Sequence, residues 1–246
     1  MSTFLLYHGE EMNKGKLYLV PTLLGECPVE KVMPEHTLEI IRRLNFFIVE
    51  EIRTARRFLK KVNDQILIDQ ITFFIYNEHT GYQDLPGFLR PAETGDDIGL
   101  LSEAGTPCIA DPGSEIVGLA HRSGISVIPL TGPSSLLLAL EASGFNGQNF
   151  VFHGYLPVDR ILRTKRIKEI EKSVYEKGQT QLFIETPYRN LQLFKAITDT
   201  CKDETKLCLA IDLTTGSETI IVKKVHEWRK GNPTIHKRPC VFLLYR

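Results

Sequence analysis

Short apolar runs and amphipathic stretches alternate along almost the whole chain. The runs at residues 17–20, 45–49 and 98–101 are short and have no polar face, which is typical of buried strands. Between the first two, residues 37–44 place Leu38, Ile41 and Leu44 at helical spacing, with two arginines facing the other way. The same reasoning predicts further strands at 71–76, 126–130, 150–152, 181–185, 207–212 and 239–245, and helices at 114–123, 133–143, 160–177 and 190–200. Residues 219–222 are expected to form a hairpin with a neighbouring strand.

Strands that alternate with helices predict α/β layers in which most strand pairs are parallel. Glycines close several of the predicted helices, as at Gly124 and Gly144. The pattern of residues changes at Thr131, Gly132 and Pro133, where we place a domain boundary. We therefore expect two α/β domains, 14–130 and 131–246, each with a mainly parallel or mixed sheet flanked by helices.

The composition is that of an ordinary folded chain, with 42% hydrophobic and 24% charged residues among 246. Thirty basic and thirty acidic residues cancel, so the whole chain has no electrostatic preference for nucleic acid or membranes. No apolar run approaches the ~18 residues that a membrane-spanning helix needs. Residues 1–11 lack a basic leader and are not expected to be a secretion signal.

Several well-known sites are excluded by spacing. The chain contains no Gly-x-Gly-x-x-Gly loop, no Gly-x-x-x-x-Gly-Lys-Ser/Thr loop and no Gly-x-Ser-x-Gly turn. No two histidines are four residues apart, so we expect no metal site. The five cysteines are odd in number and scattered, which favours free thiols and a cytoplasmic protein.

Three loops rich in glycine and proline follow predicted strands. They read Leu-Ser-Glu-Ala-Gly-Thr-Pro at 101–107, Asp-Pro-Gly at 111–113 and Pro-Leu-Thr-Gly-Pro-Ser-Ser at 129–135. Shorter pieces accompany them in a fixed order: Tyr-Leu-Val-Pro-Thr at 18–22, Glu-Glu-Ile-Arg at 50–53, Asn-Glu at 77–78, Gly-Tyr-Leu-Pro at 154–157 and Glu-Thr-Pro-Tyr-Arg at 185–189.

Taken in order, these pieces resemble the tetrapyrrole methylase superfamily, whose members bind S-adenosylmethionine. The likeness is to the ribosomal RNA small-subunit ribose 2′-O-methyltransferase I branch and covers the chain from Gly15 onward. The resemblance implies an S-adenosylmethionine-dependent methyltransferase with an active-site cleft between its two domains. It also implies a homodimer, a role in ribosomal RNA processing, and ribosomal RNA or the small ribosomal subunit as partner.

The resemblance also implies which residues bind the cofactor. Small residues such as Ala104 and Gly105 would let the backbone approach the ligand, and prolines would stiffen the loops. The expected cofactor-binding residues are Pro21, Ser102, Ala104, Gly105, Thr106, Pro107, Thr131, Gly132, Pro133, Ser134, Ser135, Gly154, Tyr155, Glu185, Thr186, Asp212 and Thr219.

Three carboxylates on these motifs, Glu51, Glu78 and Glu103, are the candidates for acid–base catalysis. A ribose hydroxyl is a poor nucleophile near neutral pH, so a positioned proton acceptor would assist methyl transfer. Each carboxylate could equally cap a helix or hold a loop. Arg53 and Arg189 are candidates for substrate binding, by contact with phosphate, or could simply pair with carboxylates.

Two features leave the methyl acceptor open. Residues 211–215 read Ile-Asp-Leu-Thr-Thr where the branch has Arg-Glu-Leu-Thr-Lys, so two cations are missing. Positive charge is nevertheless concentrated at residues 42–61, 159–178 and 221–238, either as solvated surface or as a rim that attracts an RNA backbone. Three functions remain: methylation of ribosomal RNA, methylation of a small molecule such as a tetrapyrrole, or cofactor binding without turnover.

Overall fold

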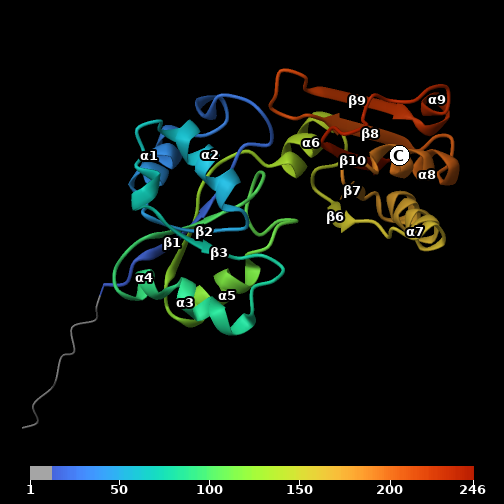
Figure 1. The fold of residues 1–246 in the computed structure, drawn as a ribbon. Coiled ribbons are helices and arrows are strands. Elements are labelled where there is room, and N and C mark those ends of the chain that lie inside the picture. The colour runs from blue at the N-terminus through green and yellow to red at the C-terminus, as the bar shows by residue number, and fades with distance from the viewer. Residues whose placement is uncertain (1–12) are drawn as a thin grey trace, which may run out of the picture. The chain divides into compact units, whose positions relative to one another are not determined.

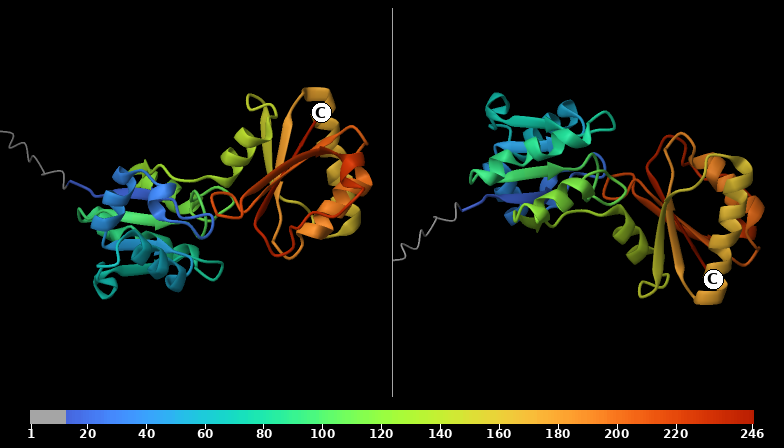
Figure 2. Two further views of the ribbon diagram at one scale, coloured as in Figure 1. Left: turned by 90° about the horizontal axis from the view of Figure 1, so that it is seen from above. Right: turned by 90° about the horizontal axis from the view of Figure 1, so that it is seen from below.

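The computed structural model describes residues 13–246, which divide into two compact units. The first unit comprises the described residues up to Thr22 together with Met33–Gly132, and the second comprises Leu23–Val32 and Pro133–Arg246. Each unit contains one five-stranded sheet flanked by helices, as Figures 1 and 2 show. The expected fold class of two α/β domains is therefore confirmed. No helix within residues 13–246 is long and apolar enough to cross a membrane.

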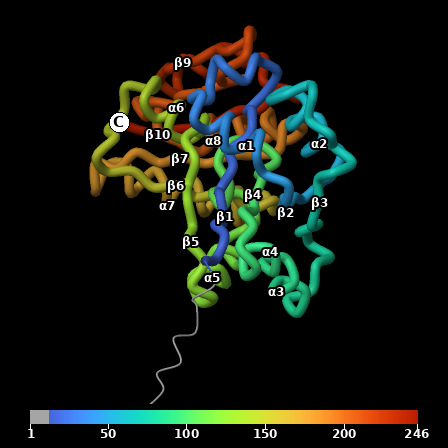
Figure 3. Tube along the Cα trace, turned by 90° about the vertical axis from the view of Figure 1, so that its left-hand side faces the viewer, coloured from blue at the N-terminus to red at the C-terminus, as the bar shows by residue number. Residues whose placement is uncertain are grey.

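The first unit is built on a fully parallel sheet with strand order β3-β2-β4-β1-β5, which can be followed in Figure 3. Its strands are β1 (Lys16–Val20), β2 (Phe46–Val49), β3 (Thr72–Ile75), β4 (Ile98–Leu101) and β5 (Ser126–Pro129). Its helices are α1 (Glu35–Arg43), α2 (Ile52–Val62), α3 (Leu85–Phe88), α4 (Arg90–Glu93) and α5 (Ser114–Arg122), with 3-10 turns at Ile68–Gln70 and Tyr82–Asp84. Because all five strands run the same way, their carboxyl ends meet at one edge.

Helices cover both faces of this sheet. On one face, α3, α4 and α5 bury Leu85, Ala92 and Ile116 against β1 and β4. On the other face, the fully buried ring of Phe47 lies across Gly99 of β4. A Cβ atom at residue 99 would lie 2.8 Å from the Phe47 ring, so the aromatic core requires glycine at this position.

The second unit has a mixed sheet with strand order β6-β7-β10-β8-β9, in which only β6 and β7 pair in parallel. Its strands are β6 (Phe150–Tyr155), β7 (Thr180–Ile184), β8 (Lys206–Ile211), β9 (Thr219–Lys224) and β10 (Cys240–Tyr245). Its helices are α6 (Ser135–Ser143), α7 (Arg160–Lys177), α8 (Asn190–Thr200) and α9 (Val225–Trp228), with a 3-10 turn at Val29–Lys31. The hairpin expected from residues 219–222 is β9, which pairs with β8.

Two apolar layers hold the second unit together. On one face, α7, α8 and α9 bury Ile167, Phe194 and Trp228 against the stacked rings of Phe183 and Phe242. On the other face, α6 packs on the opposite side chains of the same strands. Helix α6 begins at Ser135 rather than at 133, because Ser134 occupies its N-cap position. All five cysteines of the chain carry free thiols.

Candidate functional site

The loops that follow the parallel strands of the first unit are held to one another at the carboxyl edge of the sheet. Ser102, directly after β4, is buried, and its Oγ donates to the carbonyl of Gly105 at 2.5 Å. The same carbonyl accepts the backbone N–H of Thr22, which follows β1, at 2.9 Å. Gly105 has a φ of 74°, a left-handed conformation that favours glycine. The predicted loop 101–107 is therefore a tight turn fastened to the end of β1.

The loop after β5 packs against the same strand end. A Cβ atom at Gly132 would lie 2.3 Å from Cγ of Pro21, so only glycine fits there. The carbonyl of Thr131 accepts the hydroxyl of Thr37 on α1 at 2.9 Å. Gly132 therefore allows two loops to pack closely together. This packing alone explains the glycine, without any contact to a ligand.

The three predicted catalytic carboxylates line one pocket. A cavity of about 390 Å³ is bounded by loops that follow β2, β3 and β4. Its lining residues are Glu50, Glu51, Asn77, Glu78, His79 and Glu103. Three sequence motifs separated by about 25 residues each are therefore brought together by the parallel order of the sheet.

Burial and neighbouring carboxylates raise the pKa of Asp111 and of Glu103 at this edge of the sheet. Burial raises the pKa of Asp111 to about 8, and a hydrogen bond with Glu50 and the charges of Glu50 and Glu103 add to the effect. Burial is also the main cause that raises the pKa of Glu103, which receives a hydrogen bond from Thr54. One carboxylate oxygen of Glu50, Oε1, is buried without a hydrogen-bond partner. Asp111 can therefore hold its proton near neutral pH.

Glu50 and Asp111 were not among the residues predicted for catalysis. Glu50 precedes the candidate Glu51 in the same motif, and Asp111 belongs to the Asp-Pro-Gly turn. Their contact depends on the adjacency of β2 and β4 in the sheet, which the order of the chain does not state. The one indication in the sequence was that both residues lie on motifs that resemble those of the family.

Glu51 and Arg53 sit at the start of α2. The Glu51 carboxylate accepts the backbone N–H of Arg53 at 2.8 Å and so caps the helix, the structural role that the sequence left open. Arg53 is exposed, and no carboxylate within residues 13–246 forms an ion pair with its guanidinium. Glu78 is exposed and lies 3.7 Å from the ring of His79.

In the second unit, Arg189 is paired with a carboxylate. Its Nε and a terminal nitrogen donate to Oε1 of Glu185 at 3.0 and 2.7 Å, and the N–H of Thr186 donates to the same oxygen at 2.7 Å. The Glu185 side chain is 1% exposed, and its Oε2 is buried without a partner. Of the two roles open to Arg189, the structure shows the ion pair.

Asp212 is also bound by a cation. Its Oδ2 accepts Nε of Arg238 at 2.7 Å and the hydroxyl of Ser217 at 2.8 Å. The hydroxyl of Thr219 donates to the carbonyl of Ser217 at 3.1 Å. Ile211 is 2% exposed and belongs to the core, so an arginine at this position would be a buried charge.

The remaining predicted residues of the second unit lie at two element ends. Ser134 and Ser135 begin α6. Gly154, with a φ of 64°, forms an irregularity near the end of β6, and the following Tyr155 is exposed. Within residues 13–246, no group of three or more histidine, cysteine, aspartate or glutamate side chains is arranged to hold a metal ion.

Residues 31–228 match the family model described as Tetrapyrrole (Corrin/Porphyrin) Methylases. A protein of Pseudomonas aeruginosa named Ribosomal RNA small subunit methyltransferase I is 28% identical over 236 residues, which cover 95% of this chain and 79% of that protein. The protein of the same name from Vibrio cholerae is 31% identical over 204 residues, which cover 83% of this chain and 67% of that protein.

Two solved structures share the fold. The methyltransferase CobJ superposes with a TM-score of 0.64 at 15% identity, covering 94% of each chain. Uroporphyrin-III C-methyl transferase from Thermus thermophilus, complexed with S-adenyl homocysteine, has a TM-score of 0.58 at 16% identity, covering 94% of this chain and 98% of that one.

Proposed function

We propose that this chain, which belongs to the tetrapyrrole methylase family, transfers a methyl group from S-adenosylmethionine to a ribose hydroxyl of small-subunit ribosomal RNA. The family makes it a methyltransferase. The relatives named for ribosomal RNA, which this chain matches over most of its length, support the RNA substrate. The observation that carries the catalytic part is the gathering of Glu51, Glu78 and Glu103 around one pocket.

The residues at the carboxyl edge of the first sheet fit a cationic cofactor. S-adenosylmethionine carries a sulfonium and an ammonium group, which acidic surroundings stabilise. The buried, unpartnered Oε1 of Glu50 has a free acceptor position for such a group or for a ribose hydroxyl. When bound, the cofactor supplies an electrophilic methyl group.

The proposed cofactor-binding residues are those of the glycine and proline loops. In the first unit they are Pro21, Ser102, Ala104, Gly105, Thr106, Pro107, Thr131 and Gly132. In the second unit they are Pro133, Ser134, Ser135, Gly154, Tyr155, Glu185, Thr186, Asp212 and Thr219. The hydrogen bonds of Ser102, Glu185 and Asp212 pre-organise these loops, which lowers the entropy lost on binding.

Glu103 is the proton acceptor in this proposal. Methyl transfer to a ribose oxygen releases the hydroxyl proton, and a carboxylate with a raised pKa accepts it more readily near neutral pH. Asp111, whose pKa is raised to about 8, retains its own proton at the same pH beside Glu50 and Glu103. Glu51 fixes the start of α2, and Glu78 completes the acidic wall.

Arg53 is the residue we assign to RNA phosphate, because its guanidinium is exposed and has no ion pair within the described part of the chain. Arg189 uses two of its nitrogens on Glu185, so a phosphate contact there would be made by its remaining terminal nitrogen. Both contacts would contribute to the salt dependence of binding.

A small-molecule acceptor is the second candidate, and the acidity of the pocket favours it. A pocket walled by Glu50, Glu51, Glu78 and Glu103 repels phosphates that come close to it. The two functions separate in one assay, in which methyl-labelled S-adenosylmethionine is offered with small-subunit RNA, with intact small subunits and with a metabolite extract. Label in RNA supports the proposal, label only in the extract supports the second candidate, and label in neither contradicts both.

We further propose a cytoplasmic homodimer. Apolar side chains are exposed on three edge strands, at Ile75 of β3, Phe150 of β6 and Val222 of β9. Association of two copies would cover such edges. Light scattering should give twice the mass of one chain, and the monomer mass would contradict this part of the proposal.

A further inference from the structure

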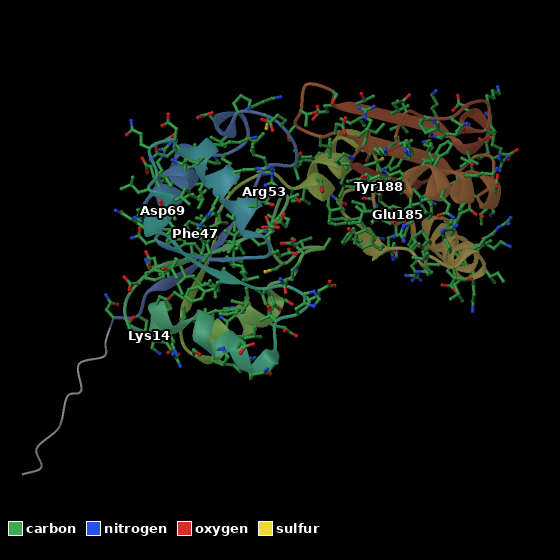
Figure 4. All side chains as sticks on the ribbon, viewed as in Figure 1. Lys14, Phe47, Arg53, Asp69, Glu185 and Tyr188 are labelled. Carbon is green, nitrogen blue, oxygen red and sulfur yellow. The ribbon has the colours of Figure 1, made fainter. Side chains whose placement is uncertain are left out.

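Tyr188 is a large aromatic side chain that the fold leaves in solvent. Its side chain is 71% exposed, although it lies three residues after the buried Glu185 (Figure 4). Its two aromatic and cationic neighbours are also exposed. The Nζ atom of Lys237 lies 5.6 Å from the centre of the ring, and the His236 ring meets it edge-on with 6.5 Å between centres. The Lys237 ammonium therefore lies over the Tyr188 ring and the His236 imidazole stands edge-on to it, while most of the tyrosine stays exposed.

These three residues are held in place by the backbone. The N–H of Lys237 donates to the carbonyl of Pro187 at 3.0 Å, which joins the 235–238 loop to the turn that carries Tyr188. The buried side-chain amide of Asn190, at the start of α8, donates to the carbonyl of Arg238 at 2.7 Å and so joins the same loop to α8. The ion pair of Arg189 with Glu185 fixes the turn itself. The turn that carries Tyr188 is thus fastened to the loop that carries His236 and Lys237.

Positive charge borders the same end of the sheet. Strands β6 and β7 are parallel neighbours whose ends meet at Tyr155 and Ile184, and α7 and α8 begin just after them. The first turns of α7 expose Arg160, Lys165 and Lys168 around a groove of about 750 Å³. The one carboxylate of this groove, Asp159, accepts the N–H of Leu162 as the helix cap.

We infer that Tyr188, with His236 and Lys237 beside it, is a stacking site for an unpaired base of the RNA substrate, and that Arg160, Lys165 and Lys168 contact the adjoining phosphates. The inference rests on the proposed RNA substrate. Bases of single-stranded RNA stack on exposed aromatic rings, whereas the bases of a duplex are already stacked and cannot reach a side chain. An exposed ring with one lysine ammonium beside it suits a nucleotide, because the base can stack on the open part of the ring and the phosphate can meet the ammonium.

The test is binding of a short unstructured RNA strand, followed by fluorescence anisotropy, with the same strand annealed to its complement as comparison. Tyr188→Ala should weaken single-strand binding by roughly 5-fold to 150-fold, the loss of one stacked base at ~1–3 kcal/mol. Tyr188→Phe keeps the ring and should bind within about 2-fold of the original protein. Duplex binding should change little in either variant.

A matched control is available in the first unit. Tyr82 is also well exposed, at 65%, and Tyr82→Ala should leave RNA binding unchanged. Lys237→Gln should lower the log–log salt slope by ~0.7, the value for one phosphate contact on a single strand, while Tyr188→Ala should leave the slope unchanged. Circular dichroism establishes that each variant is folded.

Several outcomes overturn the inference. The first is that folded Tyr188→Ala binds the single strand as tightly as the original protein. The second is that Tyr188→Ala and Tyr82→Ala have equal effects. The third is that Tyr188→Ala changes the oligomeric state but not the RNA affinity, which would assign the ring to a contact with a second copy of the chain. The proposed function fails separately. If Tyr188→Ala transfers label to RNA with an unchanged KM, only the stacking site is wrong. If the protein binds RNA tightly through the Tyr188 ring but transfers no label, only the proposed methylation of RNA is wrong.

Discussion

The two units treat the carboxylates at their strand ends in opposite ways. In the first unit, Glu50, Glu103 and Asp111 lie close together, and within residues 13–246 no lysine or arginine forms an ion pair with any of them. In the second unit, Glu185 is bound by Arg189 and Asp212 by Arg238. Both arrangements stand at the ends of sheet strands, so the difference lies in the side chains rather than in the architecture.

The comparison separates two uses of a buried carboxylate. Like charges that share a site raise one another's pKa, which keeps a proton available near neutral pH. A carboxylate paired with arginine has its charge compensated and holds its loop in one conformation. The first arrangement suits proton transfer and cation binding, and the second suits the fixing of loops. Variants that remove one group from each unit test this distinction.

The largest effect is expected from Glu103→Gln. If Glu103 accepts the hydroxyl proton, kcat should fall by about 10²-fold to 10⁴-fold, while cofactor affinity changes little. In the original protein, kcat should also fall as the pH drops below the raised pKa of Glu103, because the acceptor is then protonated. Steady-state methyl transfer measures both, and Glu93→Gln on the exposed surface of α4 is the control. Equal rates for the two variants would remove Glu103 from the chemistry.

Arg189→Met should have the next largest effect, on stability. The change leaves Glu185 buried without its cation, and breaking a buried pair costs about 3–5 kcal/mol. Since Arg189 is itself 34% exposed, we expect the lower end of that range in urea unfolding. On the neighbouring helix α8, Lys195→Met removes an exposed partner of Asp199 and should cost less than about 0.5 kcal/mol. Similar costs at both positions would mean that Glu185 does not depend on its pair.

Asp111→Asn should change how stability depends on pH. The folded protein holds the proton of Asp111 up to about pH 8, whereas the unfolded chain loses it near 3.8. The folded state therefore binds more protons across this interval, and the original protein should lose stability as the pH rises through it. Because the residue is only half-buried, we expect a loss of about 1–2 kcal/mol that Asp111→Asn lacks.

Urea unfolding near the two ends of that pH interval measures this effect. The original protein and Asp111→Asn should differ in slope, with the variant the flatter of the two. Parallel pH profiles would show that Asp111 is ionised like an ordinary surface aspartate, and the picture of mutually repelling carboxylates would then be wrong.

The smallest effect is expected from Tyr76→Phe, just beyond β3. Its hydroxyl donates to Glu115 at 3.2 Å in an exposed position, and burial together with Glu115 raises the pKa of the phenol. Loss of one exposed hydrogen bond should cost less than about 1 kcal/mol. A larger cost in urea unfolding would indicate that Glu115 belongs to the carboxylate cluster instead of standing beside it.

Several elements could be predicted from sequence by different local signals. Strand β4 and helices α7 and α8 have the predicted bounds. Strand β4 is one uninterrupted apolar run, and α7 lies between the Asp159 N-cap and Gly178 in a left-handed conformation. Helix α2 was missed although Ala55, Phe58, Leu59 and Val62 repeat at helical spacing, because its paired arginines and lysines were interpreted as a basic segment. The short helices α3, α4 and α9 have too few turns to show a period.

The candidate site was predictable as a set of motifs but not as a set of contacts. Glu51, Glu78 and Glu103 were found by their motifs, and they share a pocket because β2, β3 and β4 are neighbours in the sheet. The pairing of Asp212 with Arg238 joins residues 26 positions apart and depends on the contact of β8 with β10. Such contacts follow from strand order, which a single sequence does not contain.

The most direct test of the account is one single-turnover experiment with methyl-labelled S-adenosylmethionine and purified small-subunit RNA. The original protein should place the label on a ribose oxygen of the RNA, and Glu103→Gln, with its cofactor affinity retained, should do so at least about 100-fold more slowly. If the original protein binds the cofactor and small-subunit RNA yet leaves the RNA unlabelled, or if Glu103→Gln labels it at the original rate, the account is contradicted.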